Sequence, residues 1–155
     1  MSDYSTVAYV LGVKDAASIS PMDLARSVSA GLPTRALTLV ADAVSPDDNG
    51  FRHKVVPRAT AARNKSGVLS PAASERVARV ARVWAEAVAV WGGDVAARGF
   101  LFRPHAMLEN QAPMTVAIGS ELAPNWFAIF WVDCATARRL DGATAGQGAD
   151  RLPDR

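Results

Sequence analysis

Apolar residues recur at helical spacing through the middle of the chain. Ser70 and Pro71 open this stretch with a helix start signal, because a serine side chain accepts an amide hydrogen bond and proline suits the first helical position. Gly92 and Gly93 close it. The apolar stripe between these limits contains Val77, Val80, Ala81, Trp84, Ala87, Val88 and Trp91. The pattern predicts one long amphipathic helix.

Shorter helical patterns surround the long one. Two further serine–proline pairs, at Ser20 and Ser45, repeat the start signal, and Pro57 breaks the chain between two segments. Asp94 is expected to cap the helix after the double glycine. The predicted shorter helices cover residues 21–30, 33–44, a short segment with Phe51 and Val55, residues 58–65 and residues 94–102. Only residues 126–132 resemble a strand, so the expected fold class is all-α.

The two ends of the chain lack a helical period. Residues 1–19 are expected to form a mobile leader, although residues 7–13 are apolar enough to dock on another element. Residues 141–155 contain several glycine and proline interruptions and are expected to be disordered. The aromatic residues between 126 and 131 favour a partner-binding patch and an aggregation-prone segment equally.

Basic residues are concentrated in residues 52–82, which hold eight Lys or Arg and one acid, Glu75, for a net charge of +7. Residues 1–51 hold three basic and six acidic groups, and residues 83–155 hold six and eight, so the whole chain carries only +2. A basic segment between acidic flanks is typical of a nucleic-acid-binding surface. A solvated, arginine-rich helix face has the same composition, and the charge pattern leaves both interpretations open.

Candidate catalytic and metal-binding groups are few. The single cysteine, Cys134, excludes an internal disulfide, and together with His53 and His105 it falls short of the four ligands of a structural zinc site. A Cys134–His105 nucleophilic pair would need a rigid site, which the sequence around Cys134 does not favour. The glycine-rich segment 142–148 lacks the Gly-Lys-Ser/Thr ending of a phosphate loop. We therefore expect no enzyme activity, metal or cofactor, and a cytoplasmic protein, since the longest apolar run is too short to span a membrane.

An ordered set of motifs extends from the long helix to residue 113. The serine–proline start is followed by Arg-Val-Ala-Arg, an aromatic-Gly-x-Asp turn, an aromatic–leucine pair and spaced Pro, Leu and Pro residues. These are Ser70-Pro71, Arg79-Val80-Ala81-Arg82, Trp91-Gly92-Gly93-Asp94, Phe100-Leu101, Pro104, Leu108 and Pro113. The set resembles the toxin-binding domain of the Xre/MbcA/ParS antitoxin family. His105 stands where that family usually has asparagine, and Asn110 stands where it has glycine.

The resemblance implies four parts. Residues 1–19 would be the leader, residues 20–67 a degenerate helix-turn-helix domain, residues 68–121 the toxin-binding domain and residues 122–155 a divergent, partly disordered tail. In a helix-turn-helix domain the helix after the turn enters the DNA major groove, and residues 57–65 would take that role. The implied DNA-binding residues are Arg52, Lys54, Arg58, Arg63 and Lys65.

The resemblance also implies a partner. Members of the family are antitoxins of type II toxin–antitoxin modules that neutralise a RES-domain toxin, which consumes NAD by cleavage or by ADP-ribosylating a target. The antitoxin occludes the toxin's active site, has no catalytic role, and often represses its own promoter; a homodimer is expected. The candidate toxin-binding residues are Trp91, Asp94, Phe100, Arg103, Leu108 and Met114, with Leu101 beside them. Sequence position alone does not separate core packing from partner contact for these residues.

Two hypotheses remain beside this one. The family pattern fades after Glu121, and an abrupt cluster of aromatic residues follows, which motivates the hypothesis that the reading frame changes near residue 122. Translation of the gene in its other two frames would test it, because a native frame should restore an amphipathic helix. The rival function is a DNA-binding transcriptional regulator without a toxin partner.

Overall fold

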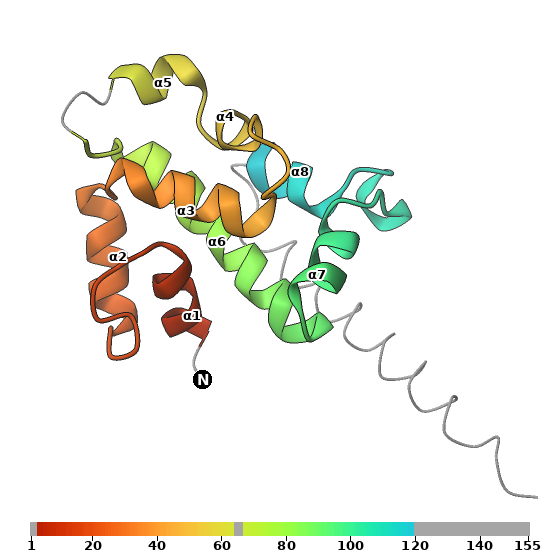
Figure 1. Ribbon diagram of the computed structural model, residues 1–155, viewed down its shortest axis with the longest axis horizontal. Helices are drawn as coiled ribbons and strands as arrows, with labels where there is room; N and C mark the ends of the chain where they lie inside the picture. The colour runs from red at the N-terminus through yellow and green to blue at the C-terminus, as the bar shows by residue number, and fades with distance from the viewer. Residues whose placement is uncertain (1–2, 64–66, 120–155) are drawn as a thin grey trace, which may run out of the picture. The chain divides into compact units, whose positions relative to one another are not determined.

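The computed structural model describes residues 3–63 and 67–119, and every regular element among them is helical (Figure 1). In chain order these elements are α1 (Asp3–Val10), α2 (Pro21–Ala30), α3 (Thr34–Val44), α4 (Phe51–Val55), α5 (Arg58–Arg63), α6 (Pro71–Trp91), α7 (Asp94–Leu101), the 3₁₀ turn η1 (Ala106–Leu108) and α8 (Pro113–Gly119). The all-α prediction is therefore confirmed. The expectations for residues 122–155, including the strand-like segment, lie outside the described residues.

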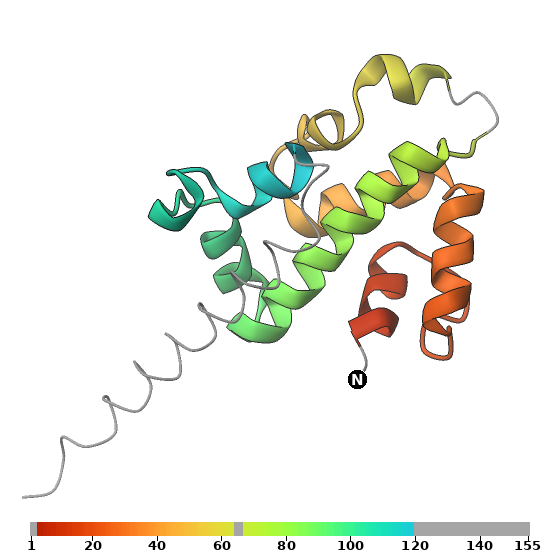
Figure 2. The same cartoon turned by 180° about the vertical axis from the view of Figure 1, so that it is seen from behind.

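Helix α6 is the centre of the fold, because α1, α2, α3, α4, α7 and α8 all pack against it (Figures 1 and 2). Its buried surface is broader than the predicted stripe, since Ala78, Val83 and Ala85 are buried as well. The many alanines of α6 allow neighbouring helices to approach on several sides. Helices from both sides of the expected domain boundary at residue 67 therefore share one core, and the described residues belong to one compact unit.

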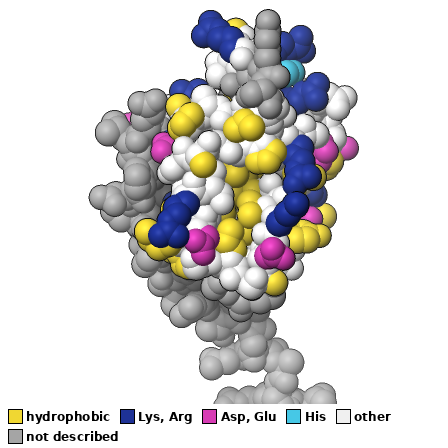
Figure 3. All heavy atoms as spheres, turned by 90° about the vertical axis from the view of Figure 1, so that its left-hand side faces the viewer, with side chains coloured by type: hydrophobic (Ala, Val, Ile, Leu, Met, Phe, Trp, Pro, Cys, Tyr) yellow, Lys and Arg dark blue, Asp and Glu magenta, His cyan; other side chains and the backbone are white. Residues whose placement is uncertain are grey.

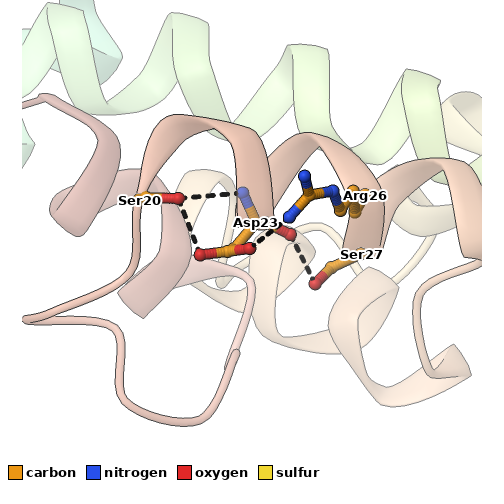
Figure 4. A network of polar contacts seen from close by, with 4 residues as sticks. All are labelled: Ser20, Asp23, Arg26 and Ser27. Atoms are coloured by element: carbon orange, nitrogen blue, oxygen red, sulfur yellow. Dashed lines mark hydrogen bonds and ion pairs between the residues drawn. The ribbon is translucent and has the colours of Figure 1, made fainter.

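Side-chain caps mark the starts of α2 and α6, as the sequence predicts. The Ser20 Oγ accepts a hydrogen bond from the Asp23 amide at 3.1 Å and donates to the Asp23 carboxylate at 2.7 Å (Figure 4). Arg26 bonds to the other Asp23 oxygen at 2.9 Å, and the Ser27 hydroxyl donates to the Asp23 carbonyl. The Ser70 Oγ accepts from the Ala73 amide in the same way.

Two predicted helix starts are wrong. The pair Ser45-Pro46 leads into a turn rather than a helix, and α4 begins only at Phe51, after Gly50. Asp94 is the first residue of α7 and not its cap, which is the preceding Gly93. Asp94 still lies in the first turn, where its negative charge interacts favourably with the positive end of the helix.

The expectation of a mobile leader is wrong for residues 3–11. Helix α1 packs against α6 and α3, and its residues Val7 and Ala8 are buried together with Leu11, which follows the helix. The Arg35 guanidinium donates to the Gly12 carbonyl at 3.3 Å, just beyond the end of α1. Three apolar residues about one turn apart are enough to dock a short helix on the core. They are too few to give the sequence a recognisable helical period.

Helix α8 was not predicted, because the sequence after Pro104 suggests only a loop bounded by prolines. Pro113 occupies the first helical position, and Met114 and Ala117, one turn apart, are buried. The Arg79 guanidinium of α6 contacts the Ala117 carbonyl at 3.5 Å. The C-terminal part of the described chain is thereby held on α6.

A small set of hydrogen bonds, which we call the clasp, closes the chain around residues 33–68. The Leu32 amide donates to the Ser74 Oγ at 2.8 Å, and the Leu32 carbonyl accepts from the Leu69 amide at 2.7 Å. The Thr34 amide donates to the Gly67 carbonyl at 2.9 Å. Ser74 is fully buried, so the clasp lies inside the core and fixes both ends of the segment that carries α3, α4 and α5.

Replacing Ser74 with alanine should lower the free energy of unfolding by about 1–3 kcal/mol, because the Leu32 amide would lose its acceptor in a buried place. Chemical denaturation would measure the change. The matched control is Ser29→Ala, on the exposed side of α2, for which we expect a change below about 0.5 kcal/mol. Equal effects of the two substitutions would contradict the role of the clasp.

Candidate nucleic-acid and partner surfaces

Helices α4 and α5 are two short helices joined by a turn, and they include the segment expected to enter the DNA major groove. Phe51, Val55 and Val56 are buried and anchor α4, and the Phe51 ring meets the Phe102 ring at 5.8 Å in an edge-to-face contact. Pro57 follows in the turn, and its carbonyl accepts the first hydrogen bonds of α5, from the Thr60 and Ala61 amides. Pro57 is therefore the N-cap residue of α5.

The described DNA-binding candidates all lie on the surface. Arg52, Arg58 and Arg63 are exposed. Lys65 lies outside the described residues. In the view of Figure 3, several basic side chains lie at the top of the face, the end at which α5 lies, and others lie lower down among the acidic side chains. The structure thus presents a basic surface around the turn and α5.

Lys54 is less available than the three arginines. Its Nζ lies 2.7 Å from the Asp48 carboxylate, and the other Asp48 oxygen accepts from the Gly50 amide at 2.8 Å. The hydrogen bond from Lys54, followed by that from Gly50, holds the pKa of Asp48 below its usual value. Lys54 therefore helps to hold the turn before α4 and carries a charge that Asp48 already balances.

His53 lies between the arginines of this surface. Its Nε2 accepts from the Arg52 Nε at 3.3 Å. Burial disfavours the charged ring, and the positive charges of Arg58 and Arg52 add to this, so the pKa of His53 is lowered from 6.5. The imidazole is therefore neutral at neutral pH, and its protonation would add a charge to an already basic surface.

Acidification should destabilise the protein through His53. Below its ordinary pKa of 6.5 the unfolded chain binds the proton more readily than the folded one, so stability falls as the pH decreases through this range. Melting temperatures measured from about pH 7 to about pH 5 should fall less steeply in His53→Gln than in the unaltered protein. Asp23 and Asp48, whose pKa values are lowered from 3.8, affect stability only at more acidic pH. Identical pH profiles for the two proteins would refute this assignment.

The candidate toxin-binding residues separate into core and surface. Phe100 and Met114 are buried, as is Leu101, and Trp91 is half-buried with its ring 4.9 Å from that of Phe100. These residues pack α7 and α8 into the core. Asp94 and Arg103 are exposed and Leu108 is partly exposed, so these three can meet a partner without unfolding the protein.

His105 organises the loop that follows α7. Its ring Nε2 lies 3.2 Å from the Phe100 carbonyl, its amide donates to the Gln111 carbonyl at 3.1 Å, and its own carbonyl accepts from the Leu108 and Asn110 amides. Asn110 has φ +60°, a left-handed conformation that asparagine tolerates better than most residues after glycine. This explains why asparagine can stand where the resembling family has glycine.

The sequence did not single out the exposed apolar side chains of this region. Val95 is 83% exposed, Met107 64% and Phe102 42%. We call these residues, together with Asp94 and Arg103, the α7–η1 surface, since all are exposed and belong to α7, η1 or the residues between them. A helical period marks only the residues that face inward, so it carries no signal for apolar residues that face outward.

Arg98 is a second residue that the sequence did not reveal. Its Nη2 donates to the Ala43 carbonyl at 2.8 Å and its Nε to the Val44 carbonyl at 3.1 Å, both at the end of α3. The guanidinium also lies 5.2 Å from the centre of the Trp84 ring. Arg98 therefore joins α7 to α3 and α6, a contact between residues more than fifty positions apart.

The described residues contain no group of three or more His, Cys, Asp or Glu side chains placed to hold a metal ion. None of the described helices combines the length and apolar character that crossing a membrane requires.

Residues 23–82 match the family model of the antitoxin Xre-like helix-turn-helix domain. The match runs from within α2 to the middle of α6, and so extends beyond residue 67, where we expected this domain to end. The N-terminal half of the chain thus contains a helix-turn-helix-type domain that is similar to the one in Xre-like antitoxins, which supports an antitoxin or a DNA-binding regulator. A comparison with curated proteins gives no match.

Proposed function

We propose that the protein is the antitoxin of a type II toxin–antitoxin module, with one surface for DNA and another for a toxin. The match of residues 23–82 to the antitoxin Xre-like helix-turn-helix domain carries this proposal. The toxin would be a NAD-consuming RES-domain protein, whose active site the antitoxin occludes. The antitoxin itself would take part in no chemistry and would work in the cytoplasm.

The DNA-binding part of the proposal is supported by the exposed arginines of α4 and α5. Arg58 and Arg63 lie at the two ends of α5, and neither forms an ion pair within the described chain. Free guanidinium groups can contact phosphates and displace their counterions. A helix-turn-helix protein usually binds two half-sites as a dimer, so we expect a homodimer on the module's own promoter.

Replacing Arg58 and Arg63 together with alanine should weaken promoter binding and reduce the dependence of log affinity on log salt by about two. Titration of promoter DNA at several salt concentrations would measure both quantities. The control loses the same charge outside the helix-turn-helix, through Lys14→Ala with Arg103→Ala, both exposed residues. An unchanged salt slope in the α5 variant would exclude α5 as a phosphate-contacting element.

The toxin-binding part of the proposal is supported by the α7–η1 surface. Met107 and Val95 are large apolar side chains that remain mostly exposed, and the loop behind Met107 is held by the backbone bonds of His105. Exposed apolar groups on an ordered loop are typical of protein-binding surfaces. Asp94 and Arg103 would form part of the polar rim.

Replacing Met107 with aspartate should weaken binding of the RES toxin by about tenfold or more and abolish the rescue of growth on co-expression. The folded protein should tolerate the change, because Met107 is 64% exposed. Met22→Asp is the matched control, since Met22 on α2 is 63% exposed. If the two variants bind the toxin equally well, the α7–η1 surface is not the toxin-binding surface.

The rival function, a DNA-binding regulator without a toxin, is favoured by one observation. The matched range ends at residue 82 and leaves the α7–η1 surface outside it. Co-expression with the product of the neighbouring gene decides between the two functions. Rescue of growth and co-purification support the antitoxin, and a non-toxic neighbour with intact promoter binding supports the regulator.

A further inference from the structure

Few interactions with the described residues stabilise helix α5. It comprises six residues, Arg58–Arg63, and none of its side chains is buried. No α5 side chain makes a hydrogen bond or an ion pair with another described residue. A helix of this length is unstable in isolation, because short helices depend on tertiary packing. The anchoring ends instead with Val55 and Val56, before α5 begins.

The start of α5 lacks the side-chain cap that other helices have. Ser20 and Ser70 each accept a hydrogen bond from the third helical amide of α2 and α6, whereas Pro57 offers no side-chain acceptor to α5. Arg58 in the first position also places a positive charge at the positive end of the helix. Helix α3 has an uncapped start as well, at Pro33, but five of its residues are buried.

These observations lead to one inference, which rests on the proposed binding of DNA. We propose that α5 opens readily in the free protein and becomes ordered on DNA, so that Pro57 tunes DNA affinity through the population of ordered α5. A partly populated binding state lowers the apparent affinity by its population, and any change that stabilises α5 should raise the affinity.

The test combines two substitutions with opposite effects on α5. Pro57→Ser adds a side-chain acceptor at the N-cap, which the Thr60 amide can share with the carbonyl of residue 57, and should raise affinity for a short mixed-sequence DNA duplex at low salt by about two- to fivefold. Ala62→Gly, at an exposed position of α5, lowers helix propensity without changing charge and should reduce affinity by a similar factor. Fluorescence anisotropy of the full chain measures both.

Matched controls separate this effect from general stability. Pro33→Ser makes the same substitution at the start of α3, and Ala89→Gly makes the same substitution on an exposed position of α6. Neither should change DNA affinity. Hydrogen exchange in the free protein adds a readout that needs no DNA: the last amides of α5 should exchange much faster than those of central α6, and Pro57→Ser should slow them.

The outcomes distinguish this inference from the proposed function. Normal DNA binding with equal affinities for all four variants, or α5 amides as protected as those of α6, would overturn the inference and leave the proposed function standing. Absence of DNA binding by the unaltered protein would overturn both. Opposite shifts in Pro57→Ser and Ala62→Gly, with unchanged controls, would support it.

Discussion

The buried hydrogen bond from the Leu32 amide to the Ser74 hydroxyl determines where the helix-turn-helix segment lies. The Leu32 carbonyl accepts from Leu69 at the same point, so the two ends of residues 33–68 are joined on α6. Gly31 makes this approach possible, because it has φ +105° and a Cβ there would lie 2.6 Å from the Leu69 carbonyl oxygen. Helix α5 has no buried residue, so its position depends on the clasp and on the buried residues of α4.

Three arginine side chains hold the remaining elements together by contacting carbonyl groups at or just beyond helix ends. Arg35 contacts the chain beyond α1, Arg79 contacts the last turn of α8, and Arg98 contacts the last carbonyls of α3. Carbonyl groups at helix C-termini lack intrahelical partners, and a guanidinium both satisfies them and complements the helix dipole. The net charge of residues 52–82 is therefore larger than the charge available to bind DNA, because Arg79 belongs to this basic segment but contacts the carbonyl of Ala117.

The candidate partner residues show the limit of inference from motifs. Phe100, Leu101 and Met114 belong to the ordered motif set or lie next to it, and the structure places all three in the core. Asp94 and Arg103 stay on the surface, beside exposed residues outside the pattern, such as Phe102 and Met107. A motif identifies the residue types that members of a family share, and a residue can be shared because it packs in the core or because it binds a partner. Solvent exposure separates the two causes, and exposure depends on which helices cover which face.

The sequence by itself determined the elements whose causes are local. Serine caps started α2 and α6, glycines ended them, and the apolar stripe from Val77 to Trp91 predicted the central helix. Tertiary structure decided what depends on distant contacts: the docking of α1, the presence of α8, the clasp at Ser74 and the role of Arg98. The physical reason is that caps and periodicity act within a few residues, whereas these contacts join positions more than thirty residues apart, whose proximity only the folded chain creates.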